Sequence, residues 1–327
     1  MMRKNEAGGA AASRRALLRA AAVAVPAMAT TGLWTAPASA AAWSGYAEVP
    51  GGLFTMSSPF AVTYNSAEYL FIRSSSDLVH VNRFDGFSWS GYTQLPGRQT
   101  RVAPTAAVYN GFLYLFVTDN AGGGKICVNR FDGSSWSGYS EVPGNGRAFL
   151  SMGTATDGQF LHLFHVGTSD RNANTIYFSR FDGSFWTPHA EVPPFRAQTR
   201  AGVSANFANG SLYMFHAGLS GTGPGTRVYV DQLSGGSWFG YFEILSNTVA
   251  TFDTPQATTL GTSQLLALRT TNNRIFIGQQ DGGVWGQFSE VPGAGSTPAG
   301  PALNAFGGGL DLFIRGHDTR VYRNTFR

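Results

Sequence analysis

Three arginines stand out because each ends a copy of the same apolar run. The runs EYLFIR, QLLALR and LDLFIR end in Arg73, Arg269 and Arg315. Asp77 and Asp318 follow the first and the last of them. A guanidinium presents a planar fork of donors that can hold a carboxylate or the hydroxyls of a sugar. We therefore predict ligand binding by these arginines with the two aspartates as partners; the alternative is a set of structural salt bridges.

Arg101 and Arg200 form a second repeated pair. They close the related phrases RQTR and AQTR, and Arg147 lies close to the same place in another copy. Both phrases fall in stretches that lack strand periodicity, which indicates loops. We predict that Arg101 and Arg200 add to the same binding surface.

The sequence favours binding over catalysis. Hydrolysis of a glycosidic bond requires two carboxylates in one pocket, but the acids of the loops are scattered. Asp253, in NTVATFDTP, is the candidate acid if the protein is an enzyme. No G-x-S-x-G elbow, phosphate-cradling loop, Asp-rich calcium loop or Cys/His cluster occurs, so we predict neither a metal nor a cofactor.

His165 and His216 occupy a position inside the apolar runs that other copies fill with Ile, Val or Leu. A mostly aliphatic position points into the core. We interpret both side chains as packed, hydrogen-bonded histidines, with a ligand-binding role as the alternative.

A repeated phrase that begins with tryptophan sets the spacing of all these residues. The phrase includes WSGYAEVPG, WSGYTQLPG and WSGYSEVPG, and its copies start at Trp43, Trp89, Trp136, Trp186, Trp238 and Trp285. A period of 46 to 52 residues with strand-like chemistry indicates a radial β-repeat whose units pack on one another.

Each repeat consists of four short strands, A to D. An Ala/Val/Thr-rich strand, the apolar run, a strand ending in a phrase such as VNRFDG and the tryptophan strand follow in order. Asn110-Gly111 and Asn209-Gly210 predict tight A–B hairpins, and Asp-Gly predicts tight C–D turns. The B–C and D–A loops vary and share the opposite face, where binding usually resides.

These units predict an all-β, six-bladed β-propeller with four-stranded blades over residues 41–327. The last repeat ends at Arg327 after its strand C, whereas Trp43–Pro50 is a lone strand D. The N-terminal strand is therefore expected to complete the last blade and close the ring.

Two repeated residues have competing interpretations. The tryptophan either fills the wedge between blades or provides a stacking platform for a sugar, and its constant place beside a turn favours packing. The strand-D glutamates recur in five copies, which indicates an architectural role; they are Glu48, Glu141, Glu191, Glu243 and Glu290.

Residues 1–40 predict an export signal. Ser13-Arg14-Arg15, with the leucines after it, is typical of a twin-arginine signal, and Ala38-Ser39-Ala40 is a small-residue cleavage site. The segment holds five Lys or Arg and one Glu, so residues 41–327 carry 18 basic and 18 acidic residues. A neutral chain lacks the charge of a nucleic-acid binder. The single cysteine, Cys127, excludes an internal disulfide.

The last repeat, LFIRGHDTRVYRNTF continued by WSGYAEVPG, resembles the repeat of bacterial fucose-binding β-propeller lectins. Arg315, Gly316 and Asp318 match the R-G-x-D turn of that repeat. In the related six-bladed fungal lectins, fucose is held by a strand-B arginine, a strand-C glutamate and an aromatic side chain of the next blade. Asn82, Asn129 and Ser179 stand near the glutamate position here.

The D-G-x-x-W turn is also similar to a shortened sialidase Asp-box. That resemblance implies one axial site, with Arg101, Arg147 and Arg200 as the arginines and Asp253 as the acid.

Together these features predict a secreted, multivalent carbohydrate-binding protein with sites between blades on the loop face. We expect its binding partner to be a saccharide. We expect no binding to nucleic acid, and no association with a membrane once the signal is removed. The alternatives are a sialidase-like glycoside hydrolase and a secreted scaffold that binds proteins.

Overall fold

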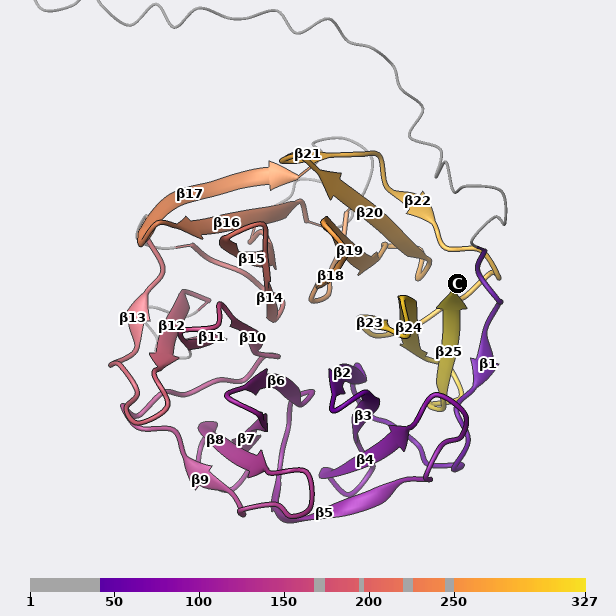
Figure 1. Ribbon diagram of the computed structural model, residues 1–327, viewed down its shortest axis with the longest axis horizontal. Helices are drawn as coiled ribbons and strands as arrows, with labels where there is room; N and C mark the ends of the chain where they lie inside the picture. The colour runs from indigo at the N-terminus through magenta and orange to yellow at the C-terminus, as the bar shows by residue number, and fades with distance from the viewer. Residues whose placement is uncertain (1–41, 168–173, 194–196, 220–225, 245–249) are drawn as a thin grey trace, which may run out of the picture. The chain divides into compact units, whose positions relative to one another are not determined.

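Six antiparallel sheets stand around a central axis in the computed structural model, which describes residues 42–167, 174–193, 197–219, 226–244 and 250–327 (Figure 1). The innermost strand of each sheet contacts the innermost strands of its two neighbours, so the sheets form a closed ring. The prediction of a six-bladed β-propeller is confirmed.

The strands of blades 1 to 3 are β2 (Phe60–Tyr64), β3 (Ala67–Arg73), β4 (Leu78–Phe84), β5 (Thr93–Gln99), β6 (Thr105–Tyr109), β7 (Phe112–Asp119), β8 (Lys125–Phe131), β9 (Ser140–Glu141), β10 (Gly153–Thr156), β11 (Leu161–Val166), β12 (Ile176–Phe181) and β13 (Ala190–Glu191).

Those of blades 4 to 6 are β14 (Val203–Ala208), β15 (Ser211–Ala217), β16 (Val228–Ser234), β17 (Ser237–Ile244), β18 (Gln256–Leu260), β19 (Ser263–Arg269), β20 (Ile275–Asp281), β21 (Val284–Trp285), β22 (Ser289–Glu290), β23 (Ala302–Phe306), β24 (Gly309–Arg315), β25 (Val321–Phe326) and β1 (Ala47–Glu48). In blade 5, both β21 and β22 pair with β20.

The turns form where their sequences predict them. Asn110 and Gly111 have φ values of 48° and 79°, the left-handed geometry of a tight A–B hairpin. In the C–D turn of blade 1, the Asp85 carboxylate accepts hydrogen bonds from the backbone N–H groups of Phe87 and Ser88, both at 2.8 Å. These local interactions set the register between consecutive strands.

The hydrophobic core lies between the blades. Six clusters of buried side chains each join two neighbouring blades. The repeated tryptophan belongs to these clusters: the ring of Trp136 in blade 2 meets the edge of Phe71 in blade 1, with centroids 6.2 Å apart. The wedge interpretation of the tryptophan is therefore confirmed, although each of the six indoles stays half-buried.

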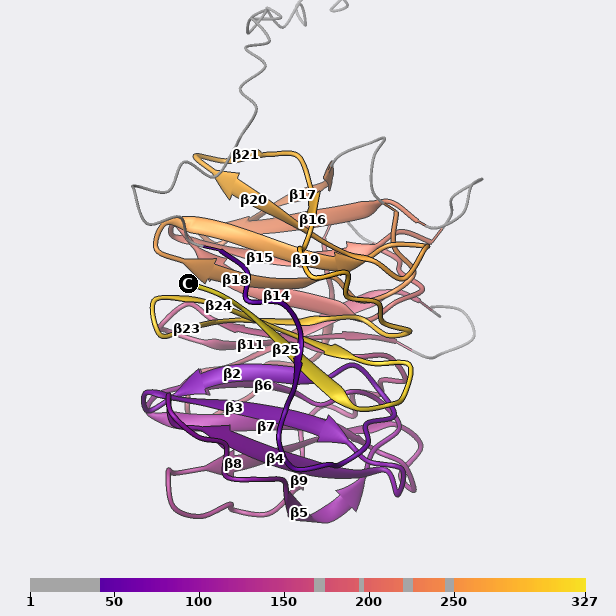
Figure 2. The same ribbon diagram turned by 90° about the vertical axis from the view of Figure 1, so that its right-hand side faces the viewer.

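The two ends of the propeller complete one blade. Strand β1 pairs with β25, and Trp43 packs on Phe326 with ring centroids 5.4 Å apart. Figure 2 shows the indigo N-terminal segment running beside the yellow β25. The strand order β1-β25-β24-β23 thus joins the start of the propeller to its end.

The export signal predicted for residues 1–40 lies outside the described residues. Within the described part of the chain, no helix is long and apolar enough to cross a membrane. Cys127 is fully buried in β8, and burial raises the pKa of its thiol.

Candidate functional site

A repeated threonine shapes the D–A loops and places Arg101 and Arg200. The buried Thr100 and Thr199 bond through their hydroxyls to the backbone two residues later. The next residue in each loop, Arg101 or Arg200, is exposed on the loop face. The two arginines therefore share one exposed position, and their part in binding stays a prediction. Arg101 also bonds to Asn120.

Arg73 ends β3 and turns back onto its own loops. Its guanidinium forms an ion pair with Asp77 and donates to the Met56 carbonyl at 3.0 Å. To bind the Arg73 guanidinium, a ligand would have to displace Asp77 or the Met56 carbonyl.

Arg269 ends β19 and is engaged in the same way. Its Nε lies 2.5 Å from Oδ2 of Asp253, and its Nη1 lies 2.5 Å from Oδ1 of Asn273. The Asp253 side chain is only 30 % exposed. Asp253 lies close to Gly300 in the D–A loop of the next blade, since a Cβ added at Gly300 would be 3.5 Å from the Asp253 Cβ. Asp253 is therefore located where two neighbouring D–A loops meet.

Arg315 ends β24 and differs from the other two. Among the described residues its guanidinium has no hydrogen bond or ion pair, and its Nε is buried. Burial lowers the pKa of Arg315, and the charge of Arg73 in the adjacent blade lowers it further. Asp318 does not pair with Arg315; its carboxylate accepts a hydrogen bond from the Tyr322 hydroxyl at 2.8 Å.

The sequence suggested that Asp77 and Asp318 occupy the same position of the B–C turn, and this is wrong: the two positions differ by one residue. Arg73 pairs with Val79 and Arg315 with Val321, which aligns Asp77 with Thr319. Asp77 and Thr319 share a left-handed φ of 63° and 67°. The B–C turn of blade 6 therefore offers no carboxylate to the guanidinium at this position.

The strand-D glutamates are architectural, as predicted. The side chains of Lys125 and Glu141 lie 2.6 Å apart, and those of Arg320 and Glu48 lie 2.6 Å apart. Equivalent pairs occur in blades 4 and 5. Each pair ties the outermost strand to the start of strand C in its blade.

His165 and His216 both point between blades, as their aliphatic neighbours suggested. Nε2 of His165 lies 3.1 Å from Nδ1 of His189, and burial lowers the pKa of His165 to about 3. His216 lies 3.9 Å from the buried Asp231, whose pKa burial raises to about 7. Among the described residues, no three His, Cys, Asp or Glu side chains gather as metal ligands.

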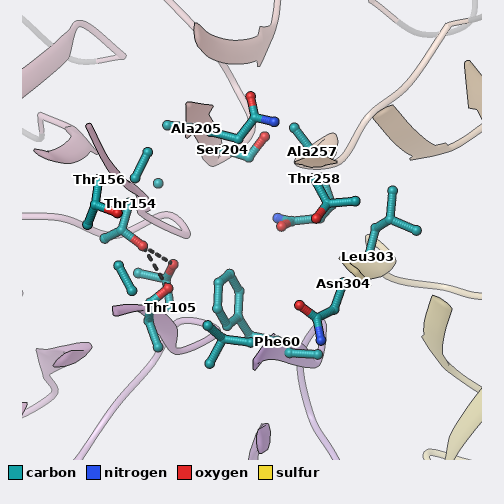
Figure 3. Close-up of a pocket in the computed structure, with 18 of the residues that line it drawn as sticks. Phe60, Thr105, Thr154, Thr156, Ser204, Ala205, Ala257, Thr258, Leu303 and Asn304 are labelled. Carbon is teal, nitrogen blue, oxygen red and sulfur yellow. Dashed lines mark hydrogen bonds between the residues drawn. The ribbon is translucent and has the colours of Figure 1, made fainter. Parts of the chain in front are cut away.

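The central channel is small and uncharged. Its cavity of about 340 Å³ is lined by the innermost strands of all six blades. Figure 3 shows Thr105, Thr154, Ser204 and Asn304 around it, with Phe60 directed toward the centre. Its described lining contains no carboxylate, histidine, lysine or arginine, and therefore no group suited to acid–base catalysis.

A second cavity, of about 490 Å³, opens between blades 1 and 2, and the sequence reasoning missed it. Its lining combines aromatic rings, one cation and neutral polar groups; these are Tyr69, Phe131, Trp136, Arg83, Asn65, Ser90, Thr93 and Gln94. We call it the 1/2 pocket. It lies where the A–B turn of blade 1 meets the C–D turn of blade 2, and not at the loop-face arginines.

Blade 1 lacks the phenylalanine that lies under the equivalent arginine of blades 2 and 3. In blades 2 and 3, Arg130 and Arg180 lie over Phe112 and Phe160, 4.4 Å and 4.7 Å from the ring centroids. The corresponding arginine of blade 1 is Arg83, and Ala67 stands in place of the phenylalanine. The sequence alone does not single out blade 1 at this position, because blades 4, 5 and 6 also lack the phenylalanine and carry Ser211, Ser263 and Gly309 there.

The sequence matches no protein-family model and no curated protein. The structure resembles solved propellers. The protein AofleA of Arthrobotrys oligospora is 11 % identical with a TM-score of 0.67, over 86 % of this chain and 87 % of that one. The fucose-specific lectin of Aleuria aurantia is 11 % identical with a TM-score of 0.64, over 83 % and 92 %. The alpha-L-arabinanase of Penicillium chrysogenum is 12 % identical with a TM-score of 0.62, over 86 % and 96 %.

At this level of identity the likeness establishes the fold alone. The Aleuria aurantia protein is described as a fungal lectin with a six-bladed β-propeller fold, which agrees with the six blades found here. The likeness to bacterial lectins remains a prediction.

The strand-C positions singled out by the lectin resemblance are buried structural links. Asn82 donates to the Pro50 carbonyl of the preceding blade at 2.8 Å, and Ser179 donates to the Thr187 carbonyl at 2.6 Å. Asn129 is also buried. None of these three side chains is accessible to a ligand.

Proposed function

We propose that this protein is a secreted glycan-binding protein and that the 1/2 pocket is its principal site. The pocket carries the proposal because a half-buried tryptophan and several neutral hydrogen-bonding groups line one cavity of about 490 Å³. Ligand sites for small molecules commonly fall in this size range and combine apolar walls with a few polar groups. Secretion rests on the export signal predicted for residues 1–40.

A sugar ring needs both kinds of surface. Its C–H face packs on an aromatic ring, and its hydroxyls require donors and acceptors. Trp136 supplies the first, and Asn65, Thr93 and Gln94 supply the second. Solved propellers of similar fold include a lectin in complex with a fucoside and an arabinanase in complex with arabinobiose, which supports a saccharide ligand for this chain.

Trp136→Phe is expected to weaken glycan binding by about 0.5–1.5 kcal/mol, because it removes part of the aromatic wall while keeping the contact with Phe71. A glycan array would select the ligand, and isothermal titration calorimetry would give its Kd. Trp186→Phe is the matched control, since Trp186 packs on Phe116 in the same way one blade further on. Equal affinities of the two variants for the tightest-binding glycan would exclude the 1/2 pocket.

The loop face provides a second candidate position at Arg315, whose guanidinium is less engaged than those of Arg73 and Arg269. Arg315→Ala is expected to weaken binding at its own site by about 1.5–3 kcal/mol, the range for a hydrogen bond to a charged group. Arg269→Ala is expected to act on stability instead, because it releases Asp253 from its ion pair. Calorimetry and thermal unfolding of both variants distinguish the two effects, and an unchanged number of sites in Arg315→Ala would show that this arginine is structural.

A panel of fluorogenic glycosides tests the hydrolase alternative in the same preparations. Asp253 is the acid assigned to that alternative, and it is paired with Arg269. Turnover that is lost in Asp253→Asn would replace binding with hydrolysis as the function.

A further inference from the structure

We propose that the 1/2 pocket selects saccharides that carry an anionic group, a carboxylate or a sulfate, and that Arg83 is the residue that recognises it. The inference rests on the proposed glycan-binding function and names the class of glycan. Within the described lining, Arg83 is the one cation, and no aspartate or glutamate accompanies it. The pocket therefore offers an excess of positive charge to whatever enters.

The guanidinium of Arg83 is free for a ligand. Among the described residues it has no hydrogen-bond partner and no aromatic ring beneath it, whereas Arg130 and Arg180 are each stacked on a phenylalanine. The nearest acid along the chain, Asp85, is affected by the charge of Arg83. Its carboxylate, however, accepts two backbone hydrogen bonds of the C–D turn and is held there.

Blade 1 has also lost the acid that other blades keep on strand D. Five blades carry a glutamate at this position, and four of these glutamates pair with a cation at the start of strand C. Blade 1 has Gln94 and Leu78 at the two positions. Ala67 thus leaves Arg83 without a stacked ring, and the neutral Gln94 brings no carboxylate to the cavity that Arg83 lines.

An arginine fork matches an anionic group better than it matches a hydroxyl. Charge-assisted hydrogen bonds to a carboxylate are shorter and about twice as strong as neutral ones. Neutral groups on the other walls, including Asn65 and Thr93, remain for the ring hydroxyls. Because Arg83 is exposed, its attraction for an anion is screened by salt.

The test compares ligand pairs that differ in one group. Methyl glycosides of glucuronic and galacturonic acid are titrated against methyl glucoside and methyl galactoside, and a 6-sulfated galactoside forms a third arm. We expect the full chain to bind at least one anionic probe about 10- to 100-fold more tightly than its neutral counterpart. This preference should fall as the ionic strength rises from 20 to 500 mM. The carboxylate and sulfate arms decide which anion is preferred.

Arg83→Gln is expected to abolish the preference, so that the anionic and neutral members of each pair bind the variant with affinities that agree within about threefold. Arg130→Gln is the matched control, because Arg130 is equally exposed at the same strand position and is stacked on Phe112. Neutral glycans that bind through Trp136 as tightly as anionic ones would overturn this inference and leave the proposed function standing. The absence of any glycan binding would overturn both, and equal losses of the preference in the Arg83 and Arg130 variants would show a nonspecific charge effect.

Discussion

Removal of residues 42–52 is expected to abolish cooperative unfolding of the propeller. The deletion takes away β1, the outermost strand of blade 6, and with it Trp43, whose ring packs on Phe326. It would also remove Val49 from the cluster between blades 6 and 1. The last strand would be left with an unpaired edge and the ring with no closing contact. Circular dichroism and calorimetry during thermal unfolding measure the effect.

A circular permutant provides the control for this deletion. The backbone N–H of Ala42 donates to the carbonyl of Arg327 at 2.9 Å, so the two ends already lie side by side. Moving residues 43–52 behind Arg327, through the Asp-Gly turn used by the other blades, is expected to restore cooperative unfolding. A deletion variant that melts like the full chain would contradict closure by the N-terminal strand.

Arg323→Met is expected to lower the free energy of unfolding by about 3–5 kcal/mol at pH 7, because among the described residues it leaves the buried Glu68 without a cation and Asp311 with Arg327 alone. Nη2 of Arg323 lies 2.5 Å from Oδ2 of Asp311 and 3.7 Å from Oε2 of Glu68. Both carboxylates are fully buried at the seam between blades 6 and 1. The arginine also covers the ring of Phe84, with its guanidinium carbon 4.2 Å from the centroid.

The same cluster predicts a dependence of stability on pH. Burial raises the pKa of Glu68, and the neighbouring Asp311 raises it further. The native state therefore binds a proton that the unfolded state releases at ordinary carboxyl pKa values. Stability from this group is present at low pH and is lost as the pH rises through the raised pKa. Because Arg323→Met removes a compensating charge, its destabilisation is expected to be smaller at pH 4 than at pH 7.

Denaturant unfolding of the wild type and the variant between pH 4 and 8 measures this difference. Adding Glu68→Gln and Asp311→Asn to the Arg323 variant is expected to recover part of the lost stability, since the neutral side chains need no counter-charge. A loss that is independent of pH and is not recovered would show that Arg323 acts through packing alone.

The sequence by itself determined the architecture of this protein. The tryptophan phrase and the Asn-Gly and Asp-Gly turns are local signals, and each acts within one blade. Six copies of such a unit can bury their apolar faces only against one another, so the fold follows from repetition. The inward position of His165, the architectural role of Glu141 and the closing strand at Trp43 were predictable for the same reason: a repeated position has a repeated environment.

Only the tertiary structure decided which polar groups are available to a ligand. Arg73, Arg269 and Arg315 occupy the same position of the repeat in sequence. In the structure, however, Arg73 forms an ion pair with Asp77 and Arg269 forms one with Asp253, so both are engaged by their own loops. Asp77 and Asp318 are one residue out of alignment in the B–C turns. The pairing of strands B and C reveals this difference. The 1/2 pocket is lined by Tyr69 and Arg83 of one blade and by Trp136 of the next, which are far apart in sequence. Contacts across a blade interface are set by packing, and packing is not encoded in the repeat of either blade alone.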